Sequence, residues 1–279
     1  MLLAVAAVLC AASTAACSTS TSTSTPDSPG DRLSVTTASP KTSYTEPGDI
    51  VPMLFPSTGA ETRFTQGLDG FLELAQDVYT RACGRGGDTA DGPPPMFVRR
   101  MALPDLVHIQ AHGFSSTPVP RPPVTRRATA VPCDADTARA EILAVKKLFV
   151  PLQAQWWNTV DTLDKSPEVR RAFEGLRTCL PAHGVAATDE DAFFGLVDSR
   201  LNALDGEPRA AAREDRRLGA VYARCMAPVE TVREKLREQR RAAFLDAHSA
   251  EVERLRAVLP ERLRQLEERY GIRYGVPVP

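Results

Sequence analysis

The stretch from Pro228 to Tyr270 constrains the fold more than any other part of the chain. Charged residues dominate it, and apolar residues recur among them every three or four positions. These apolar residues are Val229, Val232, Leu236, Ala243, Leu245, Val252, Leu255, Leu259, Leu263 and Leu266. Such spacing is typical of one face of a helix and not of a strand. We therefore expect a long charged surface helix or a helical hairpin, with a kink at Pro260.

The charges of this stretch predict a solvated face. Glu230, Glu234 and Glu238 alternate with arginines at the three- and four-residue spacings that form ion pairs along a helix. Basic residues are concentrated in 233–241, but the glutamates among them offset much of that charge. A solvated helix face is favoured over an anion-binding one.

Helical spacing and helix-ending residues recur through the rest of the body. The sequence predicts helices over 61–83, 103–112, 166–180, 188–205 and 208–226, and a kinked pair of helices on either side of Pro151. Asp134 or Asp136 can cap the first of that pair, and Ser166 caps the 166–180 helix with Pro167 at its first position. Proline and glycine crowd most of 84–132, which predicts a long irregular segment there.

The N-terminus predicts export. Residues 1–16 are an apolar run followed by small residues, the pattern of a secretory signal peptide, and they are too few to span a bilayer. Residues 17–58 are rich in Ser, Thr and Pro and bury too little apolar surface to fold, so we expect a flexible tether.

The residues Thr14-Ala15-Ala16-Cys17 resemble the lipobox of bacterial lipoproteins. This resemblance implies that Cys17 is acylated and becomes the new N-terminus. Cys10 fits the pattern less well because Leu9 stands where a small residue is usual. The alternative is ordinary cleavage near Ala16 and a freely secreted protein.

The body that follows is predicted to have two parts, 59–134 and 135–279, and it is long enough for a proper hydrophobic core. The formal net charge of the chain is −1, which gives no electrostatic basis for binding nucleic acid.

Four cysteines lie in this body: Cys83, Cys133, Cys179 and Cys225. An even number in an exported chain predicts disulfides, with three possible pairings. We favour Cys83–Cys133 and Cys179–Cys225, which are sequential and close loops of similar length. The second pair also falls at one end of an up-down-up helical bundle. The rival interpretation is a zinc site, but no CxxC spacing supports it, so no metal is predicted.

The predicted fold class is therefore mainly α. We expect a disulfide-stapled helical bundle with a long charged C-terminal helix and a Pro/Gly-rich irregular segment.

Short cysteine motifs extend a likeness over most of residues 70–270. Cys179-Leu180 with Gly184, and Cys225-Met226, are helix-borne, and Cys83 with Gly84 and Gly86 ahead of Cys133 matches more loosely. In these features the chain resembles a family of secreted or lipid-anchored helical proteins of unknown function from high-GC Gram-positive bacteria. The resemblance implies export, disulfides and helices, and it supplies no catalytic residues.

Histidine spacing offers the only local hint of chemistry. His108 and His112 would share one face of a helix with Asp105 a turn earlier, which could chelate a metal. The glutamate of a zinc-protease motif is missing, so two ordinary imidazoles are favoured. His183 and His248 are isolated, and we expect surface or helix-end histidines.

Two neighbouring tryptophans, Trp156 and Trp157, would point about 100° apart on a helix. We expect one in the core and the other near the surface, where it could stack on a sugar or contact a partner.

The chain is predicted to be a non-enzymatic binding or interaction module, without cofactors or catalytic residues. It would be lipid-anchored on the extracytoplasmic face of the cell membrane and contact an envelope or extracellular partner. The alternatives are a ligand-holding accessory of an envelope transporter, which an apolar pocket beside the tryptophans would favour, and an envelope hydrolase. The hydrolase would require acids from a distant segment to converge on His108 and His112.

Overall fold

The computed structural model describes residues 44–45, 48–82, 103–115, 135–274 and 276–277. The chain divides into two compact units, Met1–Lys41 and Thr42–Pro279. The first unit lies outside the described residues, so the description concerns the second alone.

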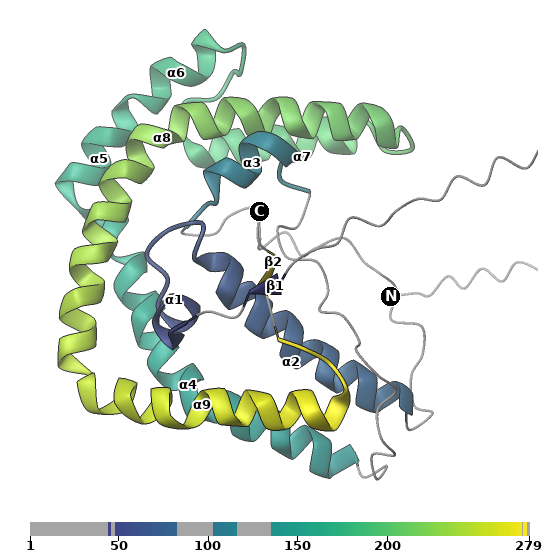
Figure 1. The fold of residues 1–279 in the computed structure, drawn as a ribbon. Coiled ribbons are helices and arrows are strands. Elements are labelled where there is room, and N and C mark those ends of the chain that lie inside the picture. Colours follow the sequence, from purple (N-terminus) through teal and green to yellow (C-terminus); the bar gives the residue numbers. More distant parts are fainter. Residues whose placement is uncertain (1–43, 46–47, 83–102, 116–134, 275, 278–279) are drawn as a thin grey trace, which may run out of the picture. The chain divides into compact units, whose positions relative to one another are not determined.

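The predicted fold class is confirmed, because helices make up nearly all of the described structure (Figure 1). They are α1 (Ile50–Leu54), α2 (Thr62–Ala82), α3 (Leu106–His112), α4 (Ala135–Asp161), the 3-10 helix η2 (Leu163–Lys165), α5 (Pro167–Glu174), α6 (Leu176–Ala182), α7 (Glu190–Asn202), α8 (Pro208–Ala247) and α9 (Ser249–Tyr270). Two short strands, β1 (Tyr44–Thr45) and β2 (Val276–Pro277), form an antiparallel pair. Within the described ranges, none of the helices combines the length and the hydropathy needed to cross a bilayer.

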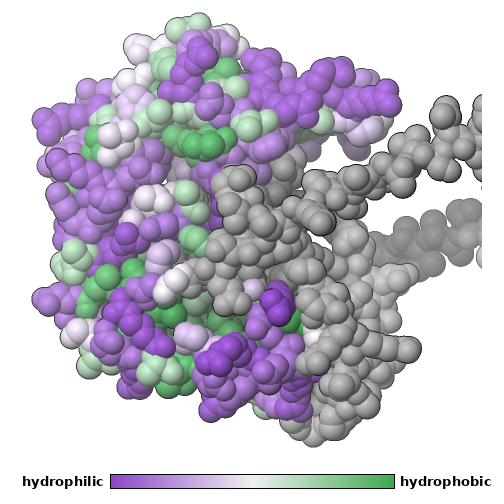
Figure 2. All heavy atoms as spheres, viewed as in Figure 1, coloured by the Kyte–Doolittle hydropathy of each residue, from purple (hydrophilic) through white to green (hydrophobic). Residues whose placement is uncertain are grey.

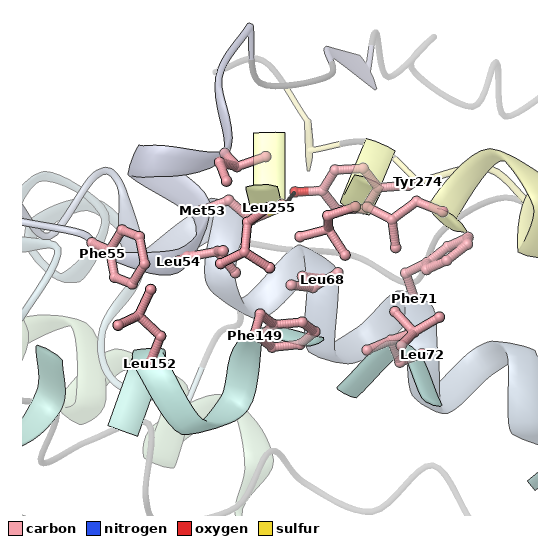
Figure 3. Packing of buried hydrophobic residues seen from close by; sticks show 14 of the residues in the cluster. Met53, Leu54, Phe55, Leu68, Phe71, Leu72, Phe149, Leu152, Leu255 and Tyr274 are labelled. Atoms are coloured by element: carbon pink, nitrogen blue, oxygen red, sulfur yellow. Dashed lines mark hydrogen bonds between the residues drawn. The ribbon is translucent and has the colours of Figure 1, made fainter. Parts of the chain in front are cut away.

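Buried apolar residues from α1, α2, α4, α9 and the end of α8 form the larger core, which we call the α2–α9 cluster. Figure 3 shows part of this packing, including Tyr274, whose hydroxyl lies 3.0 Å from the Met53 sulfur. The cluster comprises Ile50, Val51, Met53, Leu54, Phe55, Leu68, Phe71, Leu72, Leu74, Ala75, Leu103, Ile142, Val145, Phe149, Leu152, Trp156, Val160, Phe244, Val252, Leu255, Leu259, Leu263, Leu266, Tyr270, Ile272 and Tyr274.

A second core, which we call the disulfide cluster, lies around α5, α6, α7 and the first half of α8. It comprises Phe114, Val169, Leu176, Leu180, Val185, Ala187, Phe193, Phe194, Val197, Leu218, Tyr222, Cys225, Met226 and Val229. The two cores do not follow the expected division of the body at residue 134. Helix α2 packs with α4 and α9, whereas α3 packs against α8.

Folded structure is present before residue 58, the predicted end of the tether. Residues 50–55 read IVPMLF, and this apolar run forms α1 and places Leu54 and Phe55 fully in the core. Asp49 caps the helix by accepting a hydrogen bond from the Val51 N–H. The prolines and glycines on either side of this run led to the prediction of an unfolded tether, but the run itself buries enough apolar surface to fold.

Helix α8 spans 40 residues and runs past its predicted end at Met226. Pro228 removes one backbone hydrogen bond but does not end the helix. Met226 and Val229 are fully buried on either side of it, and this packing outweighs the lost bond. Figure 1 shows α8 changing direction along its length. The chain breaks instead at His248, so the C-terminal region consists of the end of α8 followed by α9, which contains Pro260.

Helix α4 is likewise a single helix of 27 residues with Pro151 inside it, where the sequence predicted a kinked pair. Phe149, Leu152 and Trp156 are buried at three- and four-residue spacing across the proline. The same core therefore holds both halves in one helix.

Between residues 166 and 206, some helix ends agree with the sequence predictions and others differ. Ser166 caps α5, accepting from the Val169 N–H at 3.2 Å, with Pro167 first in the helix as predicted. The predicted 166–180 helix divides at Gly175, a residue of low helix propensity. Helix α7 is capped by Asp189 and covers Glu190–Asn202, within the predicted 188–205 helix.

Candidate functional site

The disulfide Cys179–Cys225 joins α6 to α8 and confirms the predicted pairing. The two Cα atoms are 5.6 Å apart, and the bond closes a separation of 46 residues. Cys17, Cys83 and Cys133 lie outside the described residues, so lipidation at Cys17 and the Cys83–Cys133 bridge stay predictions.

The end of α6 brings His183 to this disulfide. The His183 N–H donates to the Cys179 carbonyl at 3.2 Å, and the Val185 N–H donates to the Leu180 carbonyl at 3.0 Å. Gly184 adopts a φ of +72°, the left-handed conformation that closes a helix of this kind. His183 is thus a helix-end histidine, as predicted. It is not isolated, however, because its ring nitrogen and the two cysteine sulfurs all lie within 4.8 Å of one another.

His108 and His112 share one face of α3, and their ring centroids are 4.7 Å apart. Asp105 does not join them as a metal ligand. Its carboxylate accepts the backbone N–H of His108 at 3.0 Å and the Arg63 Nε at 2.6 Å, so it caps α3 and pairs with α2. Among the described residues, the one group of three or more close metal-ligating side chains is Cys179, His183 and Cys225.

A carboxylate from a distant segment, Asp215, lies at the C-terminal end of α3, where it binds backbone N–H groups. Asp215 of α8 accepts the N–H groups of Phe114 and Ser115 at 3.0 and 2.9 Å. Its carboxylate lies directly against Gly113, where an added Cβ would be only 2.6 Å from an Asp215 oxygen. The carboxylate therefore fixes the end of α3. Asp215 and His112 also line one hollow of about 540 Å³.

The tryptophan prediction is confirmed. Trp156 is fully buried, and its Nε1 donates to the Pro56 carbonyl at 3.1 Å. Trp157 is only partly buried against the α2–α9 cluster.

Charged side chains on one face of α8 form what we call the ion ladder, which lies between the two cores. Its α8 members are Glu230, Arg233, Arg237 and Arg241, and its partners on other segments are Asp164 and Glu61. The predicted solvated face is wrong for these positions. Glu230, Arg233 and Arg237 are 3%, 3% and 1% exposed.

At the lower-numbered end of the ladder, Arg233 binds both oxygens of Asp164 at 2.8 and 2.7 Å and donates to Glu230 at 2.7 Å. Its guanidinium also lies 4.7 Å from the centre of the Phe173 ring. Burial alone would lower the pKa of Arg233, but Glu230 and Asp164 raise it above its ordinary value.

Beside Arg233, the Tyr222 hydroxyl donates to Glu190 Oε1 at 2.5 Å. Burial raises the pKa of Glu190 despite the opposing effects of Arg233 and this hydrogen bond. Burial and the neighbouring Glu190 raise the pKa of Tyr222 well above its ordinary value. The phenol therefore stays protonated and acts as a donor.

At the other end, Arg237 donates to the Ser57 carbonyl at 2.7 Å and to Glu230 at 2.5 Å. Arg241 donates to Glu61 at 2.6 Å, and the same Glu61 oxygen accepts the Ser57 N–H at 2.7 Å. The ladder thus ties the loop after α1 to α8.

The sequence carried a usable signal for the ladder. Tyr222, Met226, Val229 and Arg233 follow one another at helical spacing, and Arg237 and Phe244 continue the same buried face. Charged residues that interrupt an apolar stripe, without leaving its register, indicate buried ion pairs.

Hollows in the surface adjoin several of these residues. An acidic one of about 570 Å³ is lined by Asp164, Arg170, Phe173, Glu174, Arg177, Thr188, Asp189, Glu190 and Asp191. Asp164 binds Arg233, Glu190 accepts from Tyr222, and Asp189 caps α7, so these three carboxylates already have structural partners.

Another hollow, of about 500 Å³, lies between α1 and α9. Ile50, Met53, Leu263 and Tyr274 give it an apolar lining, and Arg256, paired with Asp49 at 2.7 Å, lies at its edge. Neither tryptophan lines either hollow. On the face seen in Figure 2, hydrophilic residues predominate and hydrophobic ones gather in small separate patches.

No protein-family model, curated protein or solved structure matches the chain.

Proposed function

We propose that this chain is a lipid-anchored, extracytoplasmic interaction module without enzymatic activity. The observation that carries the proposal is the Cys179–Cys225 disulfide, since such bonds form and persist in oxidising compartments. The signal-like residues 1–16 and the lipobox resemblance at Cys17 point to the same compartment.

The proposed non-enzymatic role draws its support from the ways in which the charged groups are used. The buried side chains of Glu230, Arg233 and Arg237 pair with one another and with the exposed Asp164. Asp105 and Asp215 hold backbone N–H groups of the α3 region. Charged side chains that are paired with one another or with backbone N–H groups stabilise a rigid body. Such a body suits recognition of an envelope or extracellular partner. The resemblance to lipid-anchored helical proteins of high-GC Gram-positive bacteria is in keeping with this role.

The first experiment asks where the chain resides and what Cys17 carries. The full chain is expressed in a lipoprotein-processing bacterium that is fed an alkyne fatty acid, and membrane and medium fractions are analysed by non-reducing intact mass. We expect acylated protein in the membrane fraction with Cys179 and Cys225 linked. The variant C17A is expected to lose the label and leave the membrane.

The matched control is C10A, which removes the other cysteine of the N-terminal region and should behave as the unmodified chain does. Label retained in C17A, or an unprocessed cytosolic chain with free thiols at Cys179 and Cys225, would overturn the proposal.

A further inference from the structure

Three side chains with metal-ligating atoms converge where α6 meets α8. The Cys179 and Cys225 sulfurs and a ring nitrogen of His183 lie within 4.8 Å of one another. Two sulfurs and one imidazole nitrogen are a ligand set that zinc and related cations favour.

The distances between the three ligand atoms show how far they must move to form such a site. With Zn–S bonds of about 2.3 Å and Zn–N bonds of about 2.0 Å, neighbouring ligand atoms of a tetrahedral site lie roughly 3.5–3.8 Å apart. In the disulfide the sulfurs are bonded at 2.01 Å, so they must separate by roughly 1.8 Å before a metal fits between them. The Cα atoms, 5.6 Å apart, leave room for this by rotation of the cysteine side chains.

We propose that the reduced pair Cys179 and Cys225, together with His183, binds a thiophilic divalent cation such as Zn²⁺. A dithiol reductant supplies two electrons and two protons, which break the S–S bond and yield two thiols while the reductant becomes a disulfide. Binding of the cation then displaces the two thiol protons, because the metal ligands are thiolates. The inference goes beyond the proposed function and does not rest on it.

The backbone places the histidine before any metal arrives. The backbone of His183 is held by the carbonyls at the end of α6 and by the turn at Gly184, one helical turn beyond Cys179. A ligand whose backbone is held in place by the fold loses less freedom on binding. The same two helices would then be joined by a disulfide in an oxidising compartment and by a metal ion in a reducing one.

Partial exposure of two ligands provides access. Cys179 and His183 are partly exposed, whereas Cys225 is 3% exposed. A thiol reductant can therefore reach the Cys179 sulfur first. Solvent on that side can supply a water molecule as the fourth ligand.

The test uses the purified full chain, reduced with a phosphine under anaerobic conditions and titrated with Co²⁺ as a spectroscopic substitute for Zn²⁺. We expect thiolate-to-cobalt charge-transfer absorption, with a component that saturates at one equivalent and disappears on addition of Zn²⁺. The unreduced protein should lack this component. Because other cysteines are also reduced, the variant C179S/C225S defines the background.

The decisive variant is H183A, which should weaken binding of the one-equivalent component about tenfold or more. His248 closes α8 as His183 closes α6, so H248A is the matched control and should bind as the unmodified chain does. Equal absorption in the unmodified chain and C179S/C225S, or equal affinity in H183A and H248A, would overturn the proposal. Circular dichroism follows the fold, and a reduced chain that unfolds and does not refold with Zn²⁺ would also overturn it.

Discussion

The two cores of this protein are held together in different ways. The α2–α9 cluster is built from long helices, with 21 residues in α2, 27 in α4 and 22 in α9. The disulfide cluster gathers α5, α6 and α7, of 8, 7 and 13 residues, against the first half of α8. Isolated helices as short as α5 and α6 are unstable in water, so they depend on their contacts with α8.

The disulfide cluster is linked to α8 in two ways. Cys179–Cys225 joins α6 to α8. The rings of Phe114, Phe193, Phe194 and Tyr222, whose centroids lie 5.2–5.9 Å apart, join α7 and the segment after α3 to α8. Ring pairs also occur in the α2–α9 cluster, such as Phe55–Phe244 and Trp156–Phe244. Among the described residues, the difference is therefore that the region of short helices is linked by a disulfide, whereas the region of long helices packs along continuous apolar faces.

The largest predicted effect concerns the ion ladder between the two cores. R237M removes the guanidinium that joins the Ser57 carbonyl to Glu230 and leaves one face of that buried carboxylate without its partner. We expect a loss of about 3–5 kcal/mol in the free energy of unfolding, measured in urea. R240M, an exposed arginine of the same helix, is the control. Equal unfolding midpoints for the two variants would show that the ladder does not couple the cores.

Removing the disulfide should destabilise the helices of the disulfide cluster more than those of the α2–α9 cluster. By the chain-entropy relation, C179S/C225S loses up to about 4 kcal/mol of stability for a separation of 46 residues. Hydrogen exchange should quicken in α5–α7 and change little in α9. L259A, fully buried in the α2–α9 cluster, should give the reverse distribution. A uniform increase across all helices in both variants would contradict the comparison.

The contact between α3 and α8 gives a smaller effect. A Cβ at Gly219 would lie 2.5 Å from the Ile109 carbonyl oxygen and 2.9 Å from the Gly113 Cα, so G219A must push α3 away. We expect a loss of about 1–3 kcal/mol in the free energy of unfolding. At Gly195 in α7 an added Cβ meets nothing within 4 Å, and G195A should gain about 0.5–1 kcal/mol. If G219A and G195A shifted the thermal midpoint equally, the result would argue against close packing of α3 on α8.

The smallest effect is the pH dependence of an ion pair at the edge of the disulfide cluster. Hydrogen bonds from Arg217 and Arg200 lower the pKa of Glu214 to about 2, below its usual 4.5. The charged form therefore contributes stability above about pH 4.5, and this contribution is lost as the pH falls toward 2.

E214Q should accordingly be less stable than the unmodified chain by about 0.2–1 kcal/mol at pH 7 and equally stable near pH 2. E238Q, an exposed glutamate of α8, should show no such convergence. The test is urea unfolding of both proteins at pH 7 and pH 2. If E214Q were still less stable than the unmodified chain at pH 2, the loss could not be due to the charge of Glu214.

Local sequence rules predicted the parts of the fold that depend on local chemistry. Ser166 with Pro167 began a helix, Gly113 ended another at positive φ, and Cys179 paired with Cys225. These features follow from capping, backbone freedom and cysteine spacing, which a short stretch of sequence contains.

The missed features depend on packing between distant segments. Pro151 and Pro228 remain inside helices because buried neighbours on both sides hold them there. The burial of Arg237 depends on a carbonyl 180 residues away, at Ser57. The approach of His183 to both sulfurs likewise requires α6 to pack on α8, which no single helix pattern contains.

The short pairing of β1 with β2 bears on how any pull from the N-terminal side would reach the body. Tyr44 and Thr45 are held by Pro277 and Val276, and only a few residues later the chain enters the core at Ile50. A load applied along the N-terminal segment would therefore open two strand residues first and then act directly on α1, deep in the larger core. Deleting Val276 and Pro277 would remove this pairing, so a load from the proposed anchor would then act on α1 first.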